Sequence, residues 1–231
     1  GTTVSYSTDN GTTWSTTAPT IKNVGEISVS VKAENANYET ATNSYTLKVT
    51  PKAAVVKATA AQKTYGEADP TLASSVEGLV TGESETLIAR TVTRATGENV
   101  GTYTITASGD ASQGNYSVTY ETATFTIAKA TVNTVTVAID GWTFGESAKT
   151  PTASATFKAD GEPVVTYAVK GSDSWSATAP TAAGEYTVKA TVAETDNYVG
   201  GSATKDFTIA KAGFTVAGTN YEDVYDGASH G

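Results

Sequence analysis

The 231-residue chain contains no cysteine, no methionine and a single histidine, His230. Without cysteine, the chain has no disulfide framework, no thiolate zinc site and no cysteine nucleophile. Because the only histidine stands next to the last residue, a Ser-His-Asp triad and a histidine-ligated zinc are excluded from the rest of the chain. The sequence therefore lacks the residues on which the commonest catalytic and zinc sites depend.

Charge is also scarce, at 17% of residues, and acids outnumber bases by 24 to 15. The net charge of −9 opposes approach to nucleic acid phosphates and anionic membranes, so we expect no nucleic-acid partner. No apolar run approaches the roughly 18 residues of a membrane-spanning helix, and we expect no membrane insertion by this chain. Since the chain opens on glycine and has no initiator methionine, we also expect a longer parent protein.

One strand pattern is written three times, at 24–31, 100–107 and 183–190. In each copy a glycine is followed by apolar residues that alternate with polar ones, which predicts a half-buried strand. An Asn-Tyr pair follows each glycine after 12 to 14 residues, and then comes a closing strand with apolar residues two positions apart. The three pairs are Asn37-Tyr38, Asn115-Tyr116 and Asn197-Tyr198.

The spacing of these anchors predicts the domain organisation. The motif Tyr65-Gly66-Glu67, which we call the opening motif, recurs 79 residues later as Phe144-Gly145-Glu146, so the period is about 80 residues. The sequence predicts two complete repeats, at 52–130 and 131–212. Residues 1–51 match only the C-terminal part of a repeat, and residues 213–231 match only the opening strands of a further one.

The expected fold class is all-β. Thr, Val, Gly and Pro recur too often for a long helix, so each repeat is expected to be a small antiparallel β-sandwich of immunoglobulin-like type. Short Lys-Ala seams join the repeats, which predicts an elongated array. The alternative, β-grasp-like modules, would need a helix that the sequence does not show.

The repeat at 52–130 contains a series of short sequence motifs in a fixed order: Lys63-Thr64-Tyr65-Gly66-Glu67-Ala68-Asp69-Pro70-Thr71-Leu72, Gly78-Leu79-Val80, Glu98-Asn99-Val100-Gly101-Thr102-Tyr103, Asn115-Tyr116 and Phe125-Thr126-Ile127-Ala128-Lys129-Ala130. This series closely resembles the YGX-type MBG repeats of bacterial cell-surface adhesins. Residues 131–212 and both partial ends resemble the related YDG-like repeats, with Tyr225-Asp226-Gly227 as an opening motif. Residues 131–212 depart from that pattern in having Phe144 in place of its tyrosine.

The resemblance implies a large exported adhesin with many repeats, located extracellularly at a bacterial cell surface or cell wall. In such a protein these repeats would be a structural spacer or stalk, with no catalysis and no cofactor. The alternative is a binding module that uses exposed aromatic residues to bind host glycans or mucin. The shared motifs consist of residues that pack in strands or form turns, so the resemblance transfers no catalytic residue.

The aromatic residues are divided by whether they recur. The recurrent tyrosines are expected in the core: Tyr38, Tyr103, Tyr116, Tyr186 and Tyr198. Trp14 and Trp175 are expected to pack in hairpins. Trp142 has no equivalent in the other units, so it is predicted to be exposed and is our candidate for a ligand contact.

Five acids are expected in turns, where an aspartate hydrogen-bonds its own backbone: Asp9, Asp69, Asp140, Asp173 and Asp196. Calcium at repeat junctions is an alternative, but no closely spaced Asp-x-Asp-x-Asp pattern is present. No acid pair stands out for glycoside cleavage either. We therefore predict no catalytic, metal or cofactor residue.

The two partial repeats are complementary. An incomplete repeat leaves an unpaired sheet edge, which chains rarely tolerate alone. We expect residues 213–231 of one molecule to pair with residues 1–51 of a neighbour, head to tail, by strand addition.

Overall fold

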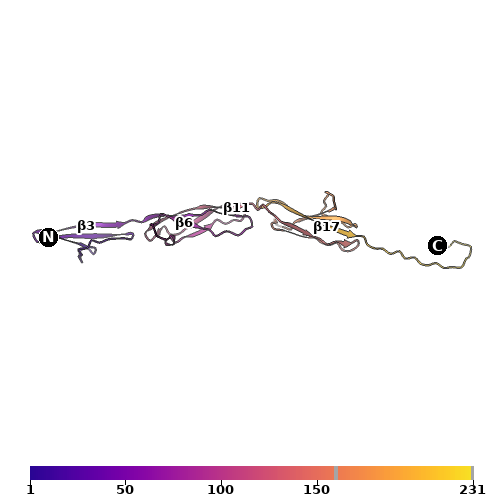
Figure 1. The fold of residues 1–231 in the computed structure, drawn as a ribbon, viewed down its shortest axis with the longest axis horizontal. Helices are drawn as coiled ribbons and strands as arrows, with labels where there is room; N and C mark the ends of the chain where they lie inside the picture. Colours follow the sequence, from indigo (N-terminus) through magenta and orange to yellow (C-terminus); the bar gives the residue numbers. More distant parts are fainter. Residues whose placement is uncertain (159–160, 230–231) are drawn as a thin grey trace. The chain divides into compact units, whose positions relative to one another are not determined.

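The computed structural model describes residues 1–158 and 161–229, so His230 lies outside the described residues. The chain divides into two compact units, Gly1–Ala128 and Lys129–Gly231. Both are built of β-strands, drawn as arrows in Figure 1. Within the described residues the only helix is the single 3₁₀ turn η1 (Glu85–Leu87). No helix in that part of the chain is long and apolar enough to cross a membrane.

Residues 3–49 form one antiparallel sheet, which we call the N-terminal sheet. Its strands are β1 (Thr3–Ser7), β2 (Gly25–Asn35) and β3 (Tyr38–Val49), in the order β1-β2-β3. After β1 the chain turns through Asn10 and Gly11, whose φ angles are 57° and 87°, and Tyr6 then pairs with Ser15. This arrangement agrees with the hairpin that the Asp9-Asn10-Gly11 sequence indicates.

Residues 52–128 form two four-stranded sheets. The first has the order β6-β4-β10-β9 and consists of β4 (Lys52–Ala58), β6 (Ser74–Glu77), β9 (Ser112–Gln113) and β10 (Tyr116–Glu121). The second has the order β5-β11-β8-β7 and consists of β5 (Ala61–Thr64), β7 (Thr91–Arg94), β8 (Gly101–Ser108) and β11 (Ala123–Ala128).

The two sheets pack face to face because their strands alternate apolar and hydroxylated residues. In β8, Ile105 and Ala107 are buried while the threonines between and beside them are exposed. One core cluster joins Ala107 of β8 to Val56 of β4 and Val118 of β10, so it contains residues of both sheets. The repeat is therefore a β-sandwich.

The chain of this repeat passes repeatedly between the two sheets, and both its opening and its closing segments do so, between β4 and β5 and between β10 and β11. As a result β10 pairs in parallel with β4 in one sheet, and β11 pairs in parallel with β5 in the other. The opening and closing segments of the repeat are thus hydrogen-bonded to each other in both layers.

The second unit repeats this plan. Its four-stranded sheet has the order β13-β17-β16-β15, and its strands are β13 (Trp142–Thr143), β15 (Val164–Val169), β16 (Gly184–Val192) and β17 (Gly201–Ala210). A two-stranded sheet pairs β12 (Val135–Ala138) with β14 (Thr152–Ala155). β13 lies parallel to β17, as β5 lies parallel to β11.

The predicted all-β fold of small sandwich repeats is confirmed. The parallel pairs of opening and closing strands add to the antiparallel pattern that the sequence predicts. The β-grasp alternative needs a helix packed on a sheet, and the described residues contain only η1. The elongated array and the repeat limits at 52, 131 and 213 stay predictions.

One of the predicted core tyrosines is not in the core. Tyr38 is 78% exposed, whereas its counterparts Tyr116 and Tyr198 are 4% and 3% exposed. Tyr116 lies on β10 beside the opening strand β4, but Tyr38 pairs with Asn35 of β2. Among the described residues no strand takes the place of β4 next to Tyr38. The core prediction is wrong for Tyr38 because the ring is buried only where an opening strand completes the sandwich.

Candidate functional site

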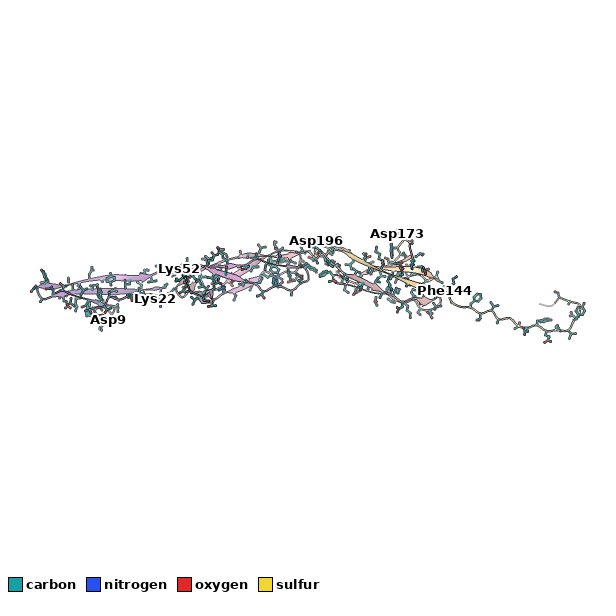
Figure 2. The ribbon with its side chains drawn as sticks, viewed as in Figure 1. Asp9, Lys22, Lys52, Phe144, Asp173 and Asp196 are labelled. Carbon is teal, nitrogen blue, oxygen red and sulfur yellow. The ribbon has the colours of Figure 1, made fainter. Side chains whose placement is uncertain are left out.

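Trp142, the candidate ligand contact, lies inside a sandwich. It is 7% exposed, and its ring stacks on Phe207 with a centroid separation of 5.3 Å and an interplanar angle of 19°. In the parallel pair of β13 and β17 it lies opposite the buried Ile209. The prediction that Trp142 is exposed is therefore wrong, because this position of the opening strand faces inward. The exposed aromatic residue of the segment is Phe144 (Figure 2).

Trp14 and Trp175 are half-buried beside hairpins, in line with the packing that the sequence predicts. The Nε1 atom of Trp14 donates a hydrogen bond of 3.0 Å to the carbonyl oxygen of Gly11. A lysine ammonium lies over each ring: Lys32 Nζ is 4.6 Å from the Trp14 centroid, and Lys189 Nζ is 5.2 Å from the Trp175 centroid. Each cation occupies one face of the ring that a sugar would otherwise stack against.

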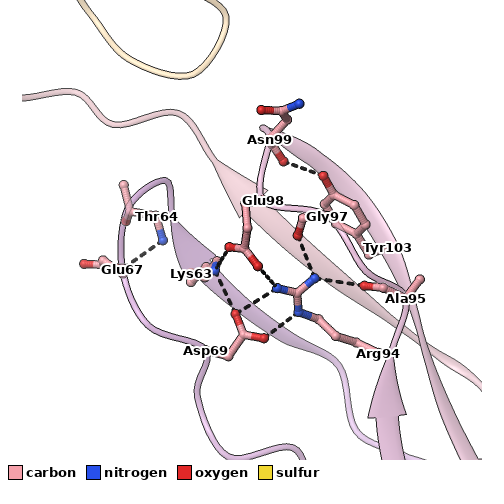
Figure 3. A network of polar contacts seen from close by, with 10 residues as sticks. All are labelled: Lys63, Thr64, Glu67, Asp69, Arg94, Ala95, Gly97, Glu98, Asn99 and Tyr103. Atoms are coloured by element: carbon pink, nitrogen blue, oxygen red, sulfur yellow. Dashed lines mark hydrogen bonds and ion pairs between the residues drawn. The ribbon is translucent and has the colours of Figure 1, made fainter. Parts of the chain in front are cut away.

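The most developed polar site of the chain is a network of four charged side chains in residues 52–128, shown in Figure 3. Lys63 comes from β5 and Arg94 from the end of β7, and their side chains are only 4% and 9% exposed. Asp69 lies between them: its Oδ1 is 2.7 Å from Lys63 Nζ, and its Oδ2 is 2.5 Å from Arg94 Nε. Glu98 forms ion pairs with the same two cations. Each carboxylate therefore bridges both basic side chains.

Arg94 is also held by groups outside the ion pairs. Its Nη1 donates to the carbonyl oxygens of Ala95 at 2.9 Å and Gly97 at 2.7 Å. Its guanidinium lies over two aromatic rings, with Cζ 4.8 Å from the Phe125 centroid and 5.5 Å from the Tyr103 centroid. The network thus ties the loop around residues 95–99 to the end of the sandwich.

The electrostatics of the network favour its charged form. Hydrogen bonds from Arg94 and then Lys63 lower the pKa of Asp69 to about 2. The same two cations lower the pKa of Glu98, and hydrogen bonds to Asp69 and Glu98 raise the pKa of Lys63. At neutral pH the carboxylates therefore stay ionised and the amine stays protonated. Each carboxylate is engaged by both cations, so the arrangement is suited to structural stabilisation.

The sequence interpretation placed Asp69 among the turn acids and did not predict the network. One signal was available in the printed chain. Lys63 alternates with Ala61 and Tyr65, so it stands at an inward position of the opening strand, where a lysine needs buried anionic partners. The partners Arg94 and Glu98 lie more than thirty positions downstream of Lys63. Only the pairing of strands brings them to this place.

The other turn acids do not form a cluster. Asp9, Asp140, Asp173 and Asp196 lie outside strands and are exposed, and three of them are labelled in Figure 2. Asp9 accepts hydrogen bonds from the backbone and hydroxyl of Thr13 and from the hydroxyl of Ser7, which lower its pKa to about 2. Across residues 1–158 and 161–229, no group of three or more His, Asp or Glu side chains is placed to hold a metal ion.

A second surface feature is the unpaired side of β3, which we call the free edge of β3. Its counterparts β11 and β17 are interior strands, each flanked by an opening strand on one side and an antiparallel neighbour on the other. In the part of the chain that the structure describes, β3 pairs only with β2. It exposes Tyr38, its first residue, and Tyr45 further along. Such an edge offers unpaired backbone groups to another strand.

Within the first unit, Asn115 connects the N-terminal sheet to the repeat that follows it. The side-chain oxygen of Asn115 accepts a 2.8 Å hydrogen bond from the N–H of Val24, and its Nδ2 donates to Asn23 at 3.2 Å. Its carbonyl oxygen accepts from the N–H of Lys52 at 2.9 Å. The asparagine of one Asn-Tyr pair thus joins the turn before β2 to the start of the next repeat.

The fold and these sites define a protein of tandem β-sandwich repeats, the first of which pairs a buried lysine and arginine with two carboxylates. A model of the MBG domain (YGX type) family matches residues 54–126, and an MBG domain model matches residues 133–213. The chain therefore carries two MBG domains in tandem, the first of the YGX type. MBG domains are a repeat type of surface proteins.

No curated protein matches the chain. Among solved structures, it is similar to the protocadherin gamma B7 extracellular cadherin domains 1-4, at 9% identity and a TM-score of 0.30. That similarity covers 81% of this chain and 58% of the protocadherin chain, which is less than two thirds of it.

Proposed function

We propose that this chain is a structural spacer: stalk repeats of a large exported bacterial surface adhesin, located extracellularly at the cell surface or cell wall and without catalytic activity. In this role the repeats hold a distal binding domain away from the envelope. The MBG matches support a surface-protein repeat, and the closed ion-pair network supports a structural use of its charged residues.

The observation that carries the proposal is the parallel pairing of opening and closing strands in each MBG domain. β5 pairs in parallel with β11, and β13 pairs in parallel with β17. When the two ends of such a repeat are pulled apart, parallel neighbours slide along each other, so their hydrogen bonds are loaded together and not one at a time. A repeat with this topology resists stretching, which is what a stalk between a cell and its target requires.

The seam at Asn115 supports the same role. Three hydrogen bonds from one residue connect the turn at Asn23-Val24 with the first residue of β4. Because those bonds join two successive structural elements, they restrict bending at the seam. A spacer needs this restriction to keep its length.

Single-molecule stretching of the full chain tests the proposal. Each repeat of about 80 residues has an extended length of about 280 Å, so its unfolding should lengthen the chain by that length less the span of the folded repeat. The Phe144 N–H donates to the Ala210 carbonyl at 2.8 Å, so Phe144→Pro removes one bond between opening and closing segments. We expect the unfolding force of one repeat to fall while that of the other stays unchanged.

Phe144→Ala is the matched control, because the Phe144 side chain is exposed and the alanine keeps the backbone N–H. Its unfolding force should equal that of the wild type. Equal unfolding forces for the proline variant and the control would contradict the mechanical function. So would unfolding of both repeats at the low forces typical of strands that separate one hydrogen bond at a time.

A glycan- or mucin-binding module is the second candidate. Trp14 and Trp175 favour it, because they are partly exposed at corresponding positions of two units. A glycan array with the wild type and with Trp14→Ala and Trp175→Ala variants tests it. Robust binding that both substitutions abolish would replace the pure spacer function.

A further inference from the structure

A pocket of the second MBG domain lies beside the hairpin that follows β15, and we call it the hairpin pocket of this domain. Its volume is about 260 Å³. The residues that line it include Tyr167, Ser174, Ser176, Thr178, Pro180 and Tyr186. Tyr167 is buried, and its backbone exchanges two hydrogen bonds of 2.8 Å with the backbone of Ser176. The pocket is therefore built on paired backbone next to the core.

A pocket at the corresponding place lies in the N-terminal sheet, and we call it the hairpin pocket of that sheet. Its volume is about 160 Å³. The residues that line it include Tyr6, Thr13, Ser15, Thr17 and Pro19. These residues and their counterparts in the second MBG domain stand 161 positions apart, as in Tyr6 and Tyr167. The backbones of Tyr6 and Ser15 exchange hydrogen bonds of 2.7 and 2.9 Å, so the hairpin is also the same.

One serine in each pocket makes the same local hydrogen bond. The Oγ of Ser176 accepts from the N–H of Thr178 at 3.0 Å, and the Oγ of Ser15 accepts from the N–H of Thr17 at 3.1 Å. A hydroxyl that accepts such a bond keeps its proton as a donor. Each pocket therefore presents an oriented serine hydroxyl that can bind a further polar group.

The lining of both pockets is uncharged. Among the described residues that form it, none is Lys, Arg, His, Asp or Glu. It combines the rings of tyrosine and proline with hydroxyl groups, which both donate and accept hydrogen bonds. An ionic ligand would lose its hydration there without gaining a counter-charge. A neutral pyranose sugar matches this lining, because it has a face of C–H groups and a rim of hydroxyls.

The first MBG domain lacks this hairpin. Tyr167 lies opposite Val188, four residues after the glycine that opens β16. Arg94 lies opposite Ile105, four residues after the glycine that opens β8. Arg94 thus occupies the position of Tyr167, but six residues separate it from β8, whereas sixteen separate Tyr167 from β16. The ion-pair network of Arg94 stands where the other two units have an uncharged pocket. The pocket is therefore a feature of the hairpin and not of every sandwich repeat.

We propose that each hairpin pocket binds one pyranose residue of a neutral glycan. The tyrosine and proline rings pack against the C–H face of the sugar, and the serine and threonine hydroxyls exchange hydrogen bonds with its hydroxyls. Two such pockets on one chain raise the avidity for a glycan that repeats the sugar. The proposal rests on the second candidate function, glycan binding, and is independent of the spacer function. It places the sugar in the pockets and not on the tryptophan faces that Lys32 and Lys189 cover.

NMR titration of the full chain tests each pocket separately. The probes are glucose, galactose, mannose, N-acetylglucosamine and N-acetylgalactosamine, with glucuronic acid as a charged comparison. At least one neutral sugar should shift the amide signals of residues 167–169 and 174–179 and those of residues 6–8 and 13–18. A dissociation constant on the order of 1 mM is expected for so small a ligand. Glucuronic acid should bind at least about tenfold more weakly, because no cation lines either pocket.

Hydroxyl removal identifies the binding groups. Thr178→Val keeps the shape of the side chain, and Ser174→Ala removes a second hydroxyl of the same pocket. The double variant should weaken sugar binding to the second MBG domain at least about tenfold, because each lost hydrogen bond lowers affinity severalfold. The pocket of the N-terminal sheet should keep its affinity and serves as an internal reference. Thr17→Val should reverse the pattern and weaken only the pocket of that sheet.

Thr181→Val and Thr20→Val are the matched controls. Both threonines are exposed, follow the prolines of the two pockets directly and line neither pocket. Each control should bind the sugar within about twofold of the wild type. Trp175→Ala should also keep sugar binding, because Trp175 does not line the pocket of the second MBG domain. Amide signals outside the two hairpins should keep their positions in every folded variant.

The outcomes separate the pockets from glycan binding in general. The proposal is overturned, and glycan binding moves to the tryptophan face, if Trp175→Ala abolishes sugar binding to the second MBG domain while the double variant keeps it. Equal weakening by Thr178→Val and Thr181→Val would also overturn it. The absence of shifts with every neutral sugar at about 100 mM, roughly a hundred times the expected dissociation constant, would overturn the pockets as sugar sites. Binding of the wild type on a glycan array would in that case leave the second candidate function standing without them.

Discussion

Replacing Trp142 with alanine should strongly destabilise the second MBG domain. The ring is almost completely buried and stacks on Phe207 at 5.3 Å, so its removal takes away both buried area and an aromatic pair. Substitutions of this kind in a core cost about 3–5 kcal/mol. A domain of this size has a total stability of about 4–12 kcal/mol. The variant should therefore lose a large part of that stability.

Hydrogen exchange of the full chain, read by mass spectrometry, measures this effect domain by domain. A loss of about 3–5 kcal/mol corresponds to exchange that is faster by about two to three and a half orders of magnitude. This acceleration should appear in β16 and β17 and be absent from β8 and β11. Trp175→Ala, which removes a half-buried ring, should cost about 1 kcal/mol. A cost below about 1 kcal/mol for Trp142→Ala would refute the assignment of its ring to the core.

Three further predictions concern the first unit. Asp69 has a pKa of about 2 against an ordinary 3.8, so it stabilises the fold above pH about 4 and loses this effect as the pH falls toward 2; urea unfolding should show less acid sensitivity in Asp69→Asn. Gly78→Ala should cost about 2–4 kcal/mol, because its Cβ would lie 2.6 Å from a backbone oxygen of β4, whereas Gly82→Ala, with a similar φ and open space, should cost about 1 kcal/mol in the same assay. Tyr116→Ala should cost about 3 kcal/mol or more and Tyr38→Ala at most about 0.5 kcal/mol; equal costs in thermal unfolding would contradict the difference in burial.

Much of the fold could be predicted from local patterns. The alternation in 100–107 predicted β8 because a strand exposes every second side chain, and the glycine turns marked where strands begin. The repeated motifs indicated that residues 52–130 and 131–212 share one arrangement of strands. The hairpin at Asp9-Asn10-Gly11 also followed from its turn signal, although Tyr6 pairs with Ser15 and not with Trp14, which the signal had placed opposite it.

The candidate sites were less predictable, because they depend on residues that are distant in sequence. The sequence predicts that Trp142 is exposed because the other units have no equivalent by residue type, yet its position corresponds to that of Lys63, and both residues are buried. Inward-facing residues of opening strands need not share a type, because their neighbours differ. Trp142 stacks on Phe207, whereas Lys63 pairs with two carboxylates. A two-residue strand such as β13 is too short for the alternation of apolar and polar residues to show which side chain faces inward.

The sequence by itself determined that the chain is all-β, repeated and organised around three glycine-led strands, because these properties follow from side-chain alternation and turn chemistry between near neighbours. The tertiary structure alone decided that opening and closing strands pair in parallel, that Lys63, Asp69, Arg94 and Glu98 form one network, and that Tyr38 is exposed while Tyr116 is buried. Burial and ion pairing depend on which distant strand lies alongside, and no local pattern carries that information.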